Sequence, residues 1–139
     1  DISGAALAVA RRNAASIGVE ERTDFVCADL FSAMGAGAKF DIVMANLPYV
    51  ASDEWHDLMT DVRVYEPRRA LDGGEGGVEV YRRLVAELPR RLVPGGHVLV
   101  EIGSSRQARD VGGMLEGAGL RVEVKRDYSG RERVLEGHG

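Results

Sequence analysis

The stretch Phe40-Asp41-Ile42-Val43-Met44-Ala45-Asn46-Leu47-Pro48-Tyr49 decides the fold. Residues 40–45 are mostly apolar and are typical of a strand buried on both faces, and polar and aromatic residues follow at its carboxyl end. In open α/β sheets, ligands bind outside the carboxyl ends of the strands. Asn46 offers a carbonyl acceptor, the residue before Pro48 is held extended so that its own carbonyl can face the cleft, and Tyr49 supplies a flat ring. Two acceptors and a ring suit an amino group.

The composition is that of one globular domain, residues 1–139, with 45% hydrophobic residues and a net charge of −4. Proteins that bind nucleic acid directly usually carry a clustered basic surface, so we do not expect this function. The single cysteine, Cys27, cannot form an internal disulfide, and no stretch approaches the roughly 18 apolar residues of a membrane span. We therefore expect a cytoplasmic protein without a membrane segment.

The chain alternates helical and strand patterns. Ser3 is a good N-cap for a helix over residues 4–17, which Gly18 ends. The other expected elements are strands at 25–28, 40–45 and 97–102, a long loop at 50–75, helices around 81–92 and 108–118, and an antiparallel pair at 121–125 and 132–136. This order predicts an α/β fold with a doubly wound, mostly parallel Rossmann-like sheet and a C-terminal antiparallel pair.

The beginning of the chain departs from the usual order of such domains. They open with a strand and a glycine-rich turn onto a helix, whereas Asp1-Ile2-Ser3 is typical of the end of a strand and the start of its helix. We therefore expect the first strand and the glycine-rich turn to be absent from this chain.

Several other chemistries lack their residues. The three histidines, His56, His97 and His138, are far apart in sequence and have no cysteine or carboxylate at metal-ligand spacing, so we expect no metal. The glycines at 73–77 follow a loop instead of a strand, which excludes a dinucleotide fingerprint. No P-loop and no Gly-x-Ser-x-Gly motif is present.

An ordered set of short motifs resembles a known family, the HemK-type glutamine N5-methyltransferases. The motifs are Asp-Ile-Ser (1–3), Ala-Asp-Leu-Phe (28–31), Asn-Leu-Pro-Tyr (46–49), Tyr-Glu-Pro (65–67), Leu-Asp-Gly-Gly (71–74), Pro-Gly-Gly (94–96), Glu-Ile-Gly (101–103) and Gly-Arg-Glu-Arg-Val (130–134). Each motif is weak by itself, but the ordered set is specific and covers nearly the whole chain. The family pattern has Asn-Pro-Pro-Tyr, so Leu47 is a departure that keeps the carbonyl and loses the rigidity of a proline.

The resemblance implies the activity and the cofactor. Members are class I S-adenosylmethionine enzymes that methylate the Gly-Gly-Gln tip of peptide chain release factors, and residues 1–139 would be the C-terminal portion of the catalytic domain. Asp1, next to Ile2, would bind the ribose hydroxyls; Asp29 would accept from the adenine amino group, and the Leu30 backbone would read the ring edge. Each acid has a structural alternative: a helix-dipole contact for Asp1 and an Asx-turn for Asp29.

The resemblance also implies the catalytic and substrate-binding residues, which are Asn46, Leu47, Pro48 and Tyr49. Asn46, which would also contact the cofactor, and the Leu47 carbonyl would bind the two N–H groups of the substrate glutamine. Tyr49 would pack on its amide plane. Glu66 would contact the protein substrate. The alternatives are a polar turn residue for Asn46 and a loop-fixing hydrogen bond to a backbone N–H for Glu66.

Two further functions remain open at this point. The same acceptors suit a glutamine of a ribosomal protein or the N6 amino group of adenine. A catalytically silent remnant or a binding module is the alternative of another class.

Overall fold

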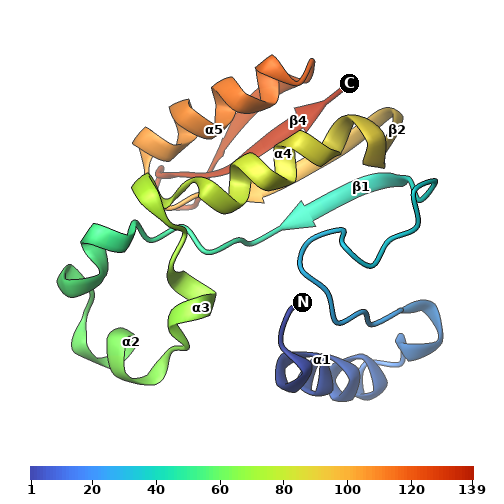
Figure 1. Ribbon diagram of the computed structural model, residues 1–139, viewed down its shortest axis with the longest axis horizontal. Helices are drawn as coiled ribbons and strands as arrows, with labels where there is room; N and C mark the ends of the chain where they lie inside the picture. Colours follow the sequence, from blue (N-terminus) through green and yellow to red (C-terminus); the bar gives the residue numbers. More distant parts are fainter. The chain divides into compact units, whose positions relative to one another are not determined.

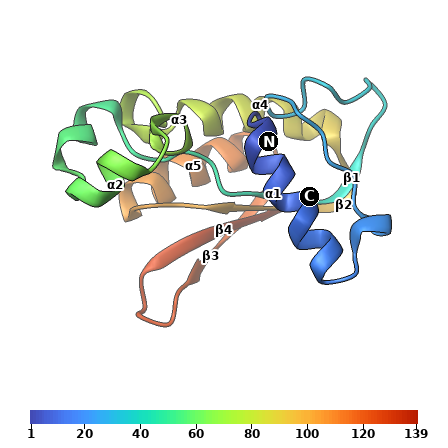
Figure 2. The same ribbon diagram turned by 90° about the horizontal axis from the view of Figure 1, so that it is seen from below.

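The computed structural model describes all residues from Asp1 to Gly139. The chain forms two compact units, Asp1–Ala38 and Lys39–Gly139, and each is described by itself. Figures 1 and 2 label the α-helices and strands of the two units.

The first unit consists of helix α1 (Gly4–Ser16), the short 3-10 helix η1 (Glu20–Arg22) and irregular chain. The expected N-cap is confirmed, because the Ser3 hydroxyl accepts a hydrogen bond from the Ala6 N–H at 3.2 Å. Gly18 follows the helix with a φ of 71°, a left-handed conformation that glycine adopts without strain. The helix therefore begins and ends where the sequence predicts, within one residue.

The strand expected at 25–28 does not form. The Asp1 amino group donates to the Val26 carbonyl at 3.2 Å, and the Ala28 N–H donates to the Asp1 carbonyl at 3.0 Å. Two parallel strands form bonds of this kind, but here Asp1 is the only residue that pairs with the segment 26–28. The prediction was wrong because a strand needs successive partners along its length, which this segment lacks.

The second unit contains one mixed sheet with the strand order β1-β2-β4-β3. The strands are β1 (Phe40–Ala45), β2 (Leu92–Glu101), β3 (Arg121–Arg126) and β4 (Glu132–His138). β1 and β2 are parallel, whereas β4 runs antiparallel to both β2 and β3, which confirms the C-terminal antiparallel pair. Among these four strands, only β1 and β2 form a parallel pair. The Pro-Gly-Gly motif at 94–96 lies within β2, where the pairing with β1 is irregular and Gly95 has a φ of 76°.

Two helices, α4 (Glu79–Arg91) and α5 (Ser105–Gly117), cover the same face of this sheet (Figures 1 and 2). Their apolar residues pack on the central strands to form the core. Its fully buried members include Leu88, Val98, Val100, Ile102, Val111, Leu115 and Leu135. The sheet and the two helices therefore form the rigid part of the unit that holds the carboxyl ends of β1 and β2 in place.

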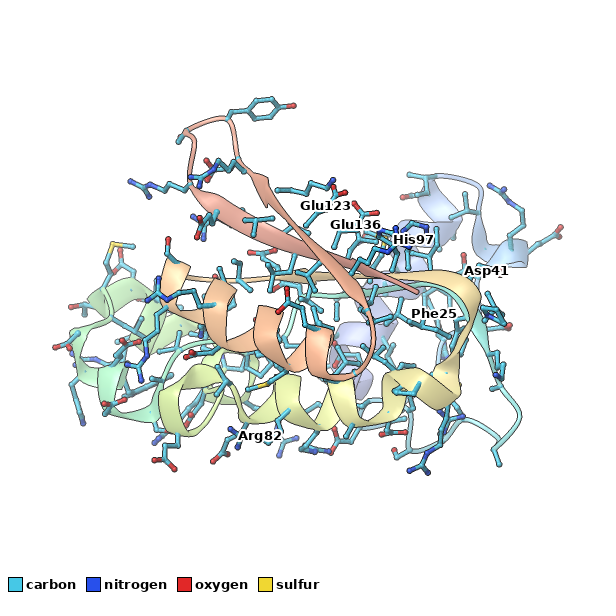
Figure 3. All side chains as sticks on the ribbon, turned by 90° about the horizontal axis from the view of Figure 1, so that it is seen from above. Phe25, Asp41, Arg82, His97, Glu123 and Glu136 are labelled. Atoms are coloured by element: carbon cyan, nitrogen blue, oxygen red, sulfur yellow. The ribbon has the colours of Figure 1, made fainter.

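The opposite face of the sheet is polar in part. Figure 3 shows His97, Glu123 and Glu136 gathered on this face. Glu136 accepts from His97 Nδ1 at 2.9 Å and pairs with Lys125 Nζ at 3.1 Å, and Lys125 also bonds Glu123 at 2.6 Å. These pairs link β2, β4 and β3 across their exposed side, where ion pairs contribute little to stability.

The burial expected for residues 40–45 is found on one face only. Ile42 and Met44 are 59% and 77% exposed, whereas Val43, which lies between them, is buried. β1 is an edge strand of the sheet and pairs only with β2. Its alternate residues point away from the helices, so the expectation of burial on both faces was wrong.

The segment from 50 to 77 is not a structureless loop. It contains η2 (Ser52–Asp57), α2 (Thr60–Tyr65), α3 (Arg68–Leu71) and η3 (Glu75–Gly77). A parallel bridge between Val50 and Asp72 closes it, and the Arg68 guanidinium lies 5.0 Å from the Trp55 ring centre. The elements are one or two turns long and carry no sustained helical period, which is why the sequence did not reveal them. None of the helices in either unit combines the length and the apolar character that crossing a bilayer requires.

Candidate active site

Asn46 is the first residue after β1, at the carboxyl end of the strand. It is exposed, and its side-chain amide makes no hydrogen bond in the structure. A turn-forming asparagine would bond a nearby backbone group. The structure thus leaves the Asn46 carbonyl oxygen able to accept a hydrogen bond from a ligand.

The three residues after Asn46 are half-buried and are held by their neighbours. The Tyr49 carbonyl accepts from Gln107 Nε2 at 2.6 Å. A Cβ added to Gly103, just beyond β2, would lie 2.7 Å from Tyr49 Cδ2, so one edge of the ring packs directly on this glycine. The Tyr49 ring is therefore fixed on one side, and its remaining surface is available to a ligand.

The segment after Tyr49 is tied to residues 71–74 by backbone hydrogen bonds. The Val50 N–H donates to the Leu71 carbonyl at 2.9 Å, and the Gly73 N–H donates to the Val50 carbonyl at 2.8 Å. A Cβ on Gly73 would lie 2.5 Å from the Pro48 carbonyl oxygen, a distance that real Cβ atoms do not adopt. Gly73 therefore permits the close approach of these two chain segments.

Asp72 connects three parts of this loop. Its carboxylate accepts from the Ser52 hydroxyl at 2.6 Å, from the Gly74 N–H at 3.1 Å and from Arg68 Nε at 2.9 Å. These bonds hold the pKa of Asp72 below its usual value because they favour the ionised form, and the bond from the Ser52 hydroxyl has the largest effect. The carboxylate therefore fixes the loop in its charged state.

Gln107, in the first turn of α5, is a residue that the sequence did not single out. Its Nε2 donates to the Tyr49 and Gly77 carbonyls, and its Oε1 accepts from the Gly103 N–H at 2.9 Å. Ser104, the N-cap, accepts from the Gln107 N–H at 3.2 Å. The pattern Ser-x-x-Gln is that of a capping box, so a helix-start signal was present in the sequence. It did not reveal that the side chain would also reach residues 49 and 77.

Tyr81 supports the same edge of the sheet from α4. Its hydroxyl donates to the Glu101 carbonyl at 2.6 Å near the end of β2, and the residue is fully buried. Burial raises the pKa of Tyr81, so the hydroxyl stays protonated and serves as a hydrogen-bond donor. This bond fixes the end of β2 relative to α4.

A groove of about 750 Å³ lies between the segment after Tyr49 and the start of α5. Its walls carry both acidic and basic side chains, among them Glu54, Glu75, Arg82, Arg106 and Asp110. Figure 3 labels Arg82 on the outer side of α4. A mixed polar groove of this kind suits a polypeptide segment better than a small apolar ligand.

Glu66 is exposed at the end of α2, and its carboxylate makes no hydrogen bond or ion pair. Its backbone N–H bonds the Val62 carbonyl, as a residue after a helix does. The structure therefore shows no loop-fixing bond from the Glu66 side chain.

The other predicted residues lie in the first unit. Asp1 Oδ1 accepts from the Ser3 N–H at 2.7 Å, which leaves its second oxygen without a partner, and Ile2 is 42% exposed. Since Ala28 bonds Asp1, the segment that leads to Asp29 lies beside Asp1. The unit thus brings its predicted acidic residues to one region.

Leu30 is the only residue other than glycine with a positive φ, 47°. The left-handed conformation costs a side-chain-bearing residue about 1–2 kcal/mol. Such strain is concentrated at functional positions, and this backbone is the one that the family resemblance assigns to the adenine edge. No group of three or more His, Cys, Asp or Glu side chains is arranged to bind a metal ion.

No protein-family model matches the sequence. The chain is 43% identical over 136 residues to the release factor glutamine methyltransferase of Cereibacter sphaeroides, covering 97% of this chain and 48% of that protein. It is also 43% identical over 136 residues to the protein of the same name from Rhodospirillum rubrum, covering 97% and 41%. The chain spans about half the length of the curated relatives it matches.

Solved structures show the fold. A ribosomal protein L11 methylase from Lactobacillus delbrueckii subsp. bulgaricus gives a TM-score of 0.64 at 17% identity, covering 99% of this chain and 53% of that one. A putative rRNA-methylase from Clostridium thermocellum gives 0.63 at 15% identity, covering 99% and 72%. The expected Rossmann-like methyltransferase fold is confirmed by these likenesses.

Proposed function

Because this chain belongs to the family of release factor glutamine methyltransferases and spans about half the length of its relatives, we propose that it forms the C-terminal portion of a class I methyltransferase catalytic domain. The proposed reaction transfers a methyl group from S-adenosylmethionine to the side-chain nitrogen of glutamine in a protein. The proposed substrate is the Gly-Gly-Gln tip of a peptide chain release factor.

The observation that carries this proposal is the unpartnered Asn46 amide at the carboxyl end of β1. A glutamine nitrogen is a poor nucleophile because its lone pair is delocalised into the carbonyl. Acceptors at Asn46 Oδ1 and the Leu47 carbonyl would bind its two N–H groups and orient the nitrogen. They would also stabilise the positive charge that develops on nitrogen as the new bond forms.

Tyr49 and Pro48 complete the proposed acceptor site. The Tyr49 ring, supported on one edge by Gly103, would pack on the amide plane of the substrate. Pro48 fixes the direction of the chain between Asn46 and Tyr49. The groove beside this segment would hold the polypeptide on either side of the glutamine, with Glu66 contacting the same protein substrate.

The residues of the first unit fit the proposed cofactor. The free oxygen of Asp1 can accept from ribose hydroxyls, with Ile2 beside it. Asp29 and the left-handed Leu30 backbone offer polar groups for the adenine edge. Asn46 is proposed to contact the cofactor as well. When bound, S-adenosylmethionine supplies the electrophilic methyl group.

The test measures binding and transfer separately. Calorimetry with S-adenosylmethionine is carried out on this chain and on a longer form of the protein. Each form is then tested for transfer of a radiolabelled methyl group to a release factor, with a Gly-Gly-Glu variant of that factor as the control. Label that appears in the Gly-Gly-Gln protein and is absent from the control supports the proposal. Equal label in both proteins would exclude glutamine as the acceptor.

A competing proposal is a catalytically silent binding module. No strand followed by a glycine-rich turn and a helix occurs in the 139 residues, so the methionine end of the cofactor lacks its usual backbone contacts. We expect no detectable methyl transfer by this chain alone. A longer form of the protein, if one is found, distinguishes the two proposals, because only the enzyme gains activity from the added residues.

A further inference from the structure

Gln107 has a buried amide side chain, with 5% of the residue's surface exposed. Its amide makes three hydrogen bonds: Nε2 to the Tyr49 carbonyl at 2.6 Å, Nε2 to the Gly77 carbonyl at 3.1 Å, and Oε1 from the Gly103 N–H at 2.9 Å. A primary amide has two donors and a carbonyl acceptor, and each finds a partner here. The bonds also fix which end of the amide is nitrogen, because two of the partners are carbonyl oxygens and the third is an N–H.

The three partners come from segments that are far apart in sequence. Tyr49 follows β1, Gly77 precedes α4, and Gly103 follows β2. These segments and the start of α5 meet at the end of the sheet in Figure 1. Gln107 therefore joins the segment that carries Asn46 to both helices and to the neighbouring strand.

Glycine at two of these positions is required by the close packing. A Cβ on Gly77, whose φ is 69°, would lie 2.6 Å from Gln107 Nε2 and would overlap the Tyr49 carbonyl oxygen. A Cβ on Gly103 would lie 3.2 Å from Gln107 Oε1 and 2.7 Å from the Tyr49 ring. The Gln107 amide thus occupies the space that a side chain at position 77 or 103 would need.

We propose that Gln107 is a positioning residue for the acceptor site: by holding the Tyr49 carbonyl, it sets the orientation of the Asn46 side chain and of the Leu47 carbonyl toward the substrate amide. The proposal rests on the proposed function for the identity of the substrate. Both donors and the carbonyl of the Gln107 amide are bonded to protein groups, so Gln107 acts on the substrate through the Tyr49 segment. A misplacement of about 1 Å at a reacting group can cost on the order of 100-fold in rate, so the effect on turnover is large.

Two variants separate the donors from the size of the side chain. Gln107→Glu keeps the shape and the acceptor for Gly103, but it removes both donors and brings a carboxylate toward two carbonyl oxygens. Gln107→Met keeps the length and removes all polar contacts, and it carries the test if the first variant does not fold. The control is Arg109→Gln, on an exposed position of the same helix.

The first measurement is made on the 139-residue chain and needs no methyl transfer. Backbone ¹⁵N relaxation reports order at Leu47, Tyr49 and Val50 in each folded variant. We expect the order parameters of these residues to fall below about 0.6 in the Gln107 variants and to stay near 0.85 in the control. Order parameters that stay high in a folded Gln107 variant would overturn the proposal, whatever the enzyme methylates.

The second measurement uses the form of the protein, this chain or a longer one, in which methyl transfer is detected. We expect kcat to fall on the order of 100-fold in the Gln107 variants, while KM for the acceptor protein changes less than about 2-fold. A folded variant with unchanged kcat, or one whose loss lies in KM alone, would contradict the positioning role. If no form of the protein transfers methyl groups, the proposed function fails, and the order parameters still decide the role of Gln107.

Discussion

Asn46 is the residue at which the proposed chemistry can be tested most directly. Replacing it with alanine removes an acceptor aimed at the charge that develops on the substrate nitrogen. By analogy with the loss of one oxyanion-hole donor, Asn46→Ala should lower kcat on the order of 10²–10³ in the active form of the protein. Folding should change little, because the side chain is exposed and makes no hydrogen bond.

Steady-state methyl transfer and a melting curve check this expectation. Asn13→Ala, the same change on an exposed position of α1, is the matched control. If Asn46→Ala methylates the substrate as fast as the control, Asn46 is an ordinary turn residue and has no role in catalysis.

Leu47 stands where the family pattern has proline, and its backbone N–H makes no hydrogen bond. Because only the carbonyl is proposed to contact the substrate, Leu47→Pro should keep or raise the activity. It should add up to about 1 kcal/mol of stability through the unfolded state, provided that the φ of Leu47 is near −65°. Urea unfolding and methyl transfer to a Gly-Gly-Gln protein measure the two effects. If a folded variant has lost this activity, the proposal that a release factor is the substrate is wrong.

At the scale of elements, we expect the order of the 50–77 segment to depend on pH through Asp72. Its pKa is lower in the folded protein than in the unfolded chain, so its contribution to stability is present above the unfolded pKa of about 3.9. That contribution is lost as the pH falls through the lower, folded value. We expect the segment to become sensitive to pepsin only below about pH 4 in the wild type.

The pH prediction has a matched pair of variants. Asp72→Asn should be cleaved faster at all pH values at which pepsin acts, and the dependence of cleavage on pH should be weaker. Asp53→Asn, on an exposed carboxylate of the same segment that makes no hydrogen bond, should behave as the wild type. An Asp72→Asn variant with the pH profile of the wild type would show that Asp72 does not hold the loop.

Elements with a local signal were predicted well. The N-cap Ser3 and Gly18 mark the ends of α1, and the alternation of residues 121–136 predicts the β3–β4 pair. The failures depend on partners that the sequence does not show. Residues 25–28 have a strand pattern but find only Asp1 beside them, and the short helices of residues 50–77 depend on the bridge between Val50 and Asp72. The same difference applies to the site. Asn46 was predicted from its own sequence motif, whereas the role of Gln107 became visible only from its hydrogen bonds to residues 49, 77 and 103 in the structure.

At the scale of the whole molecule, the two units differ in how much they bury. Ala14 is the only buried residue of the first unit, whereas the second unit contains all the fully buried side chains. Protection from hydrogen exchange follows burial and hydrogen bonding. We therefore expect the amides of Val98, Val100 and Leu135 to exchange only on global unfolding, and those of α1 to exchange earlier.

Native-state hydrogen exchange at increasing denaturant measures this difference. The amides of α1 should show opening free energies well below those of β2 and β4. One common opening free energy for α1, β2 and β4 would mean that the chain unfolds as a single cooperative body.

The close packing of glycine around the Tyr49 segment has a consequence for how freely this sequence can vary. Gly73, Gly77 and Gly103 have no room for a Cβ, since Pro48, Tyr49 and Gln107 occupy the space. At Gly35, Gly37, Gly113 and Gly117 an added Cβ meets nothing within 4 Å. In a library with every position randomised, and with selection for folded protein alone, the first three glycines would therefore be recovered almost unchanged, and the last four would be replaced freely. The positions at which the chain cannot vary would then mark the packing around Pro48, Tyr49 and Gln107, even though none of those glycines has a side chain that could take part in any chemistry.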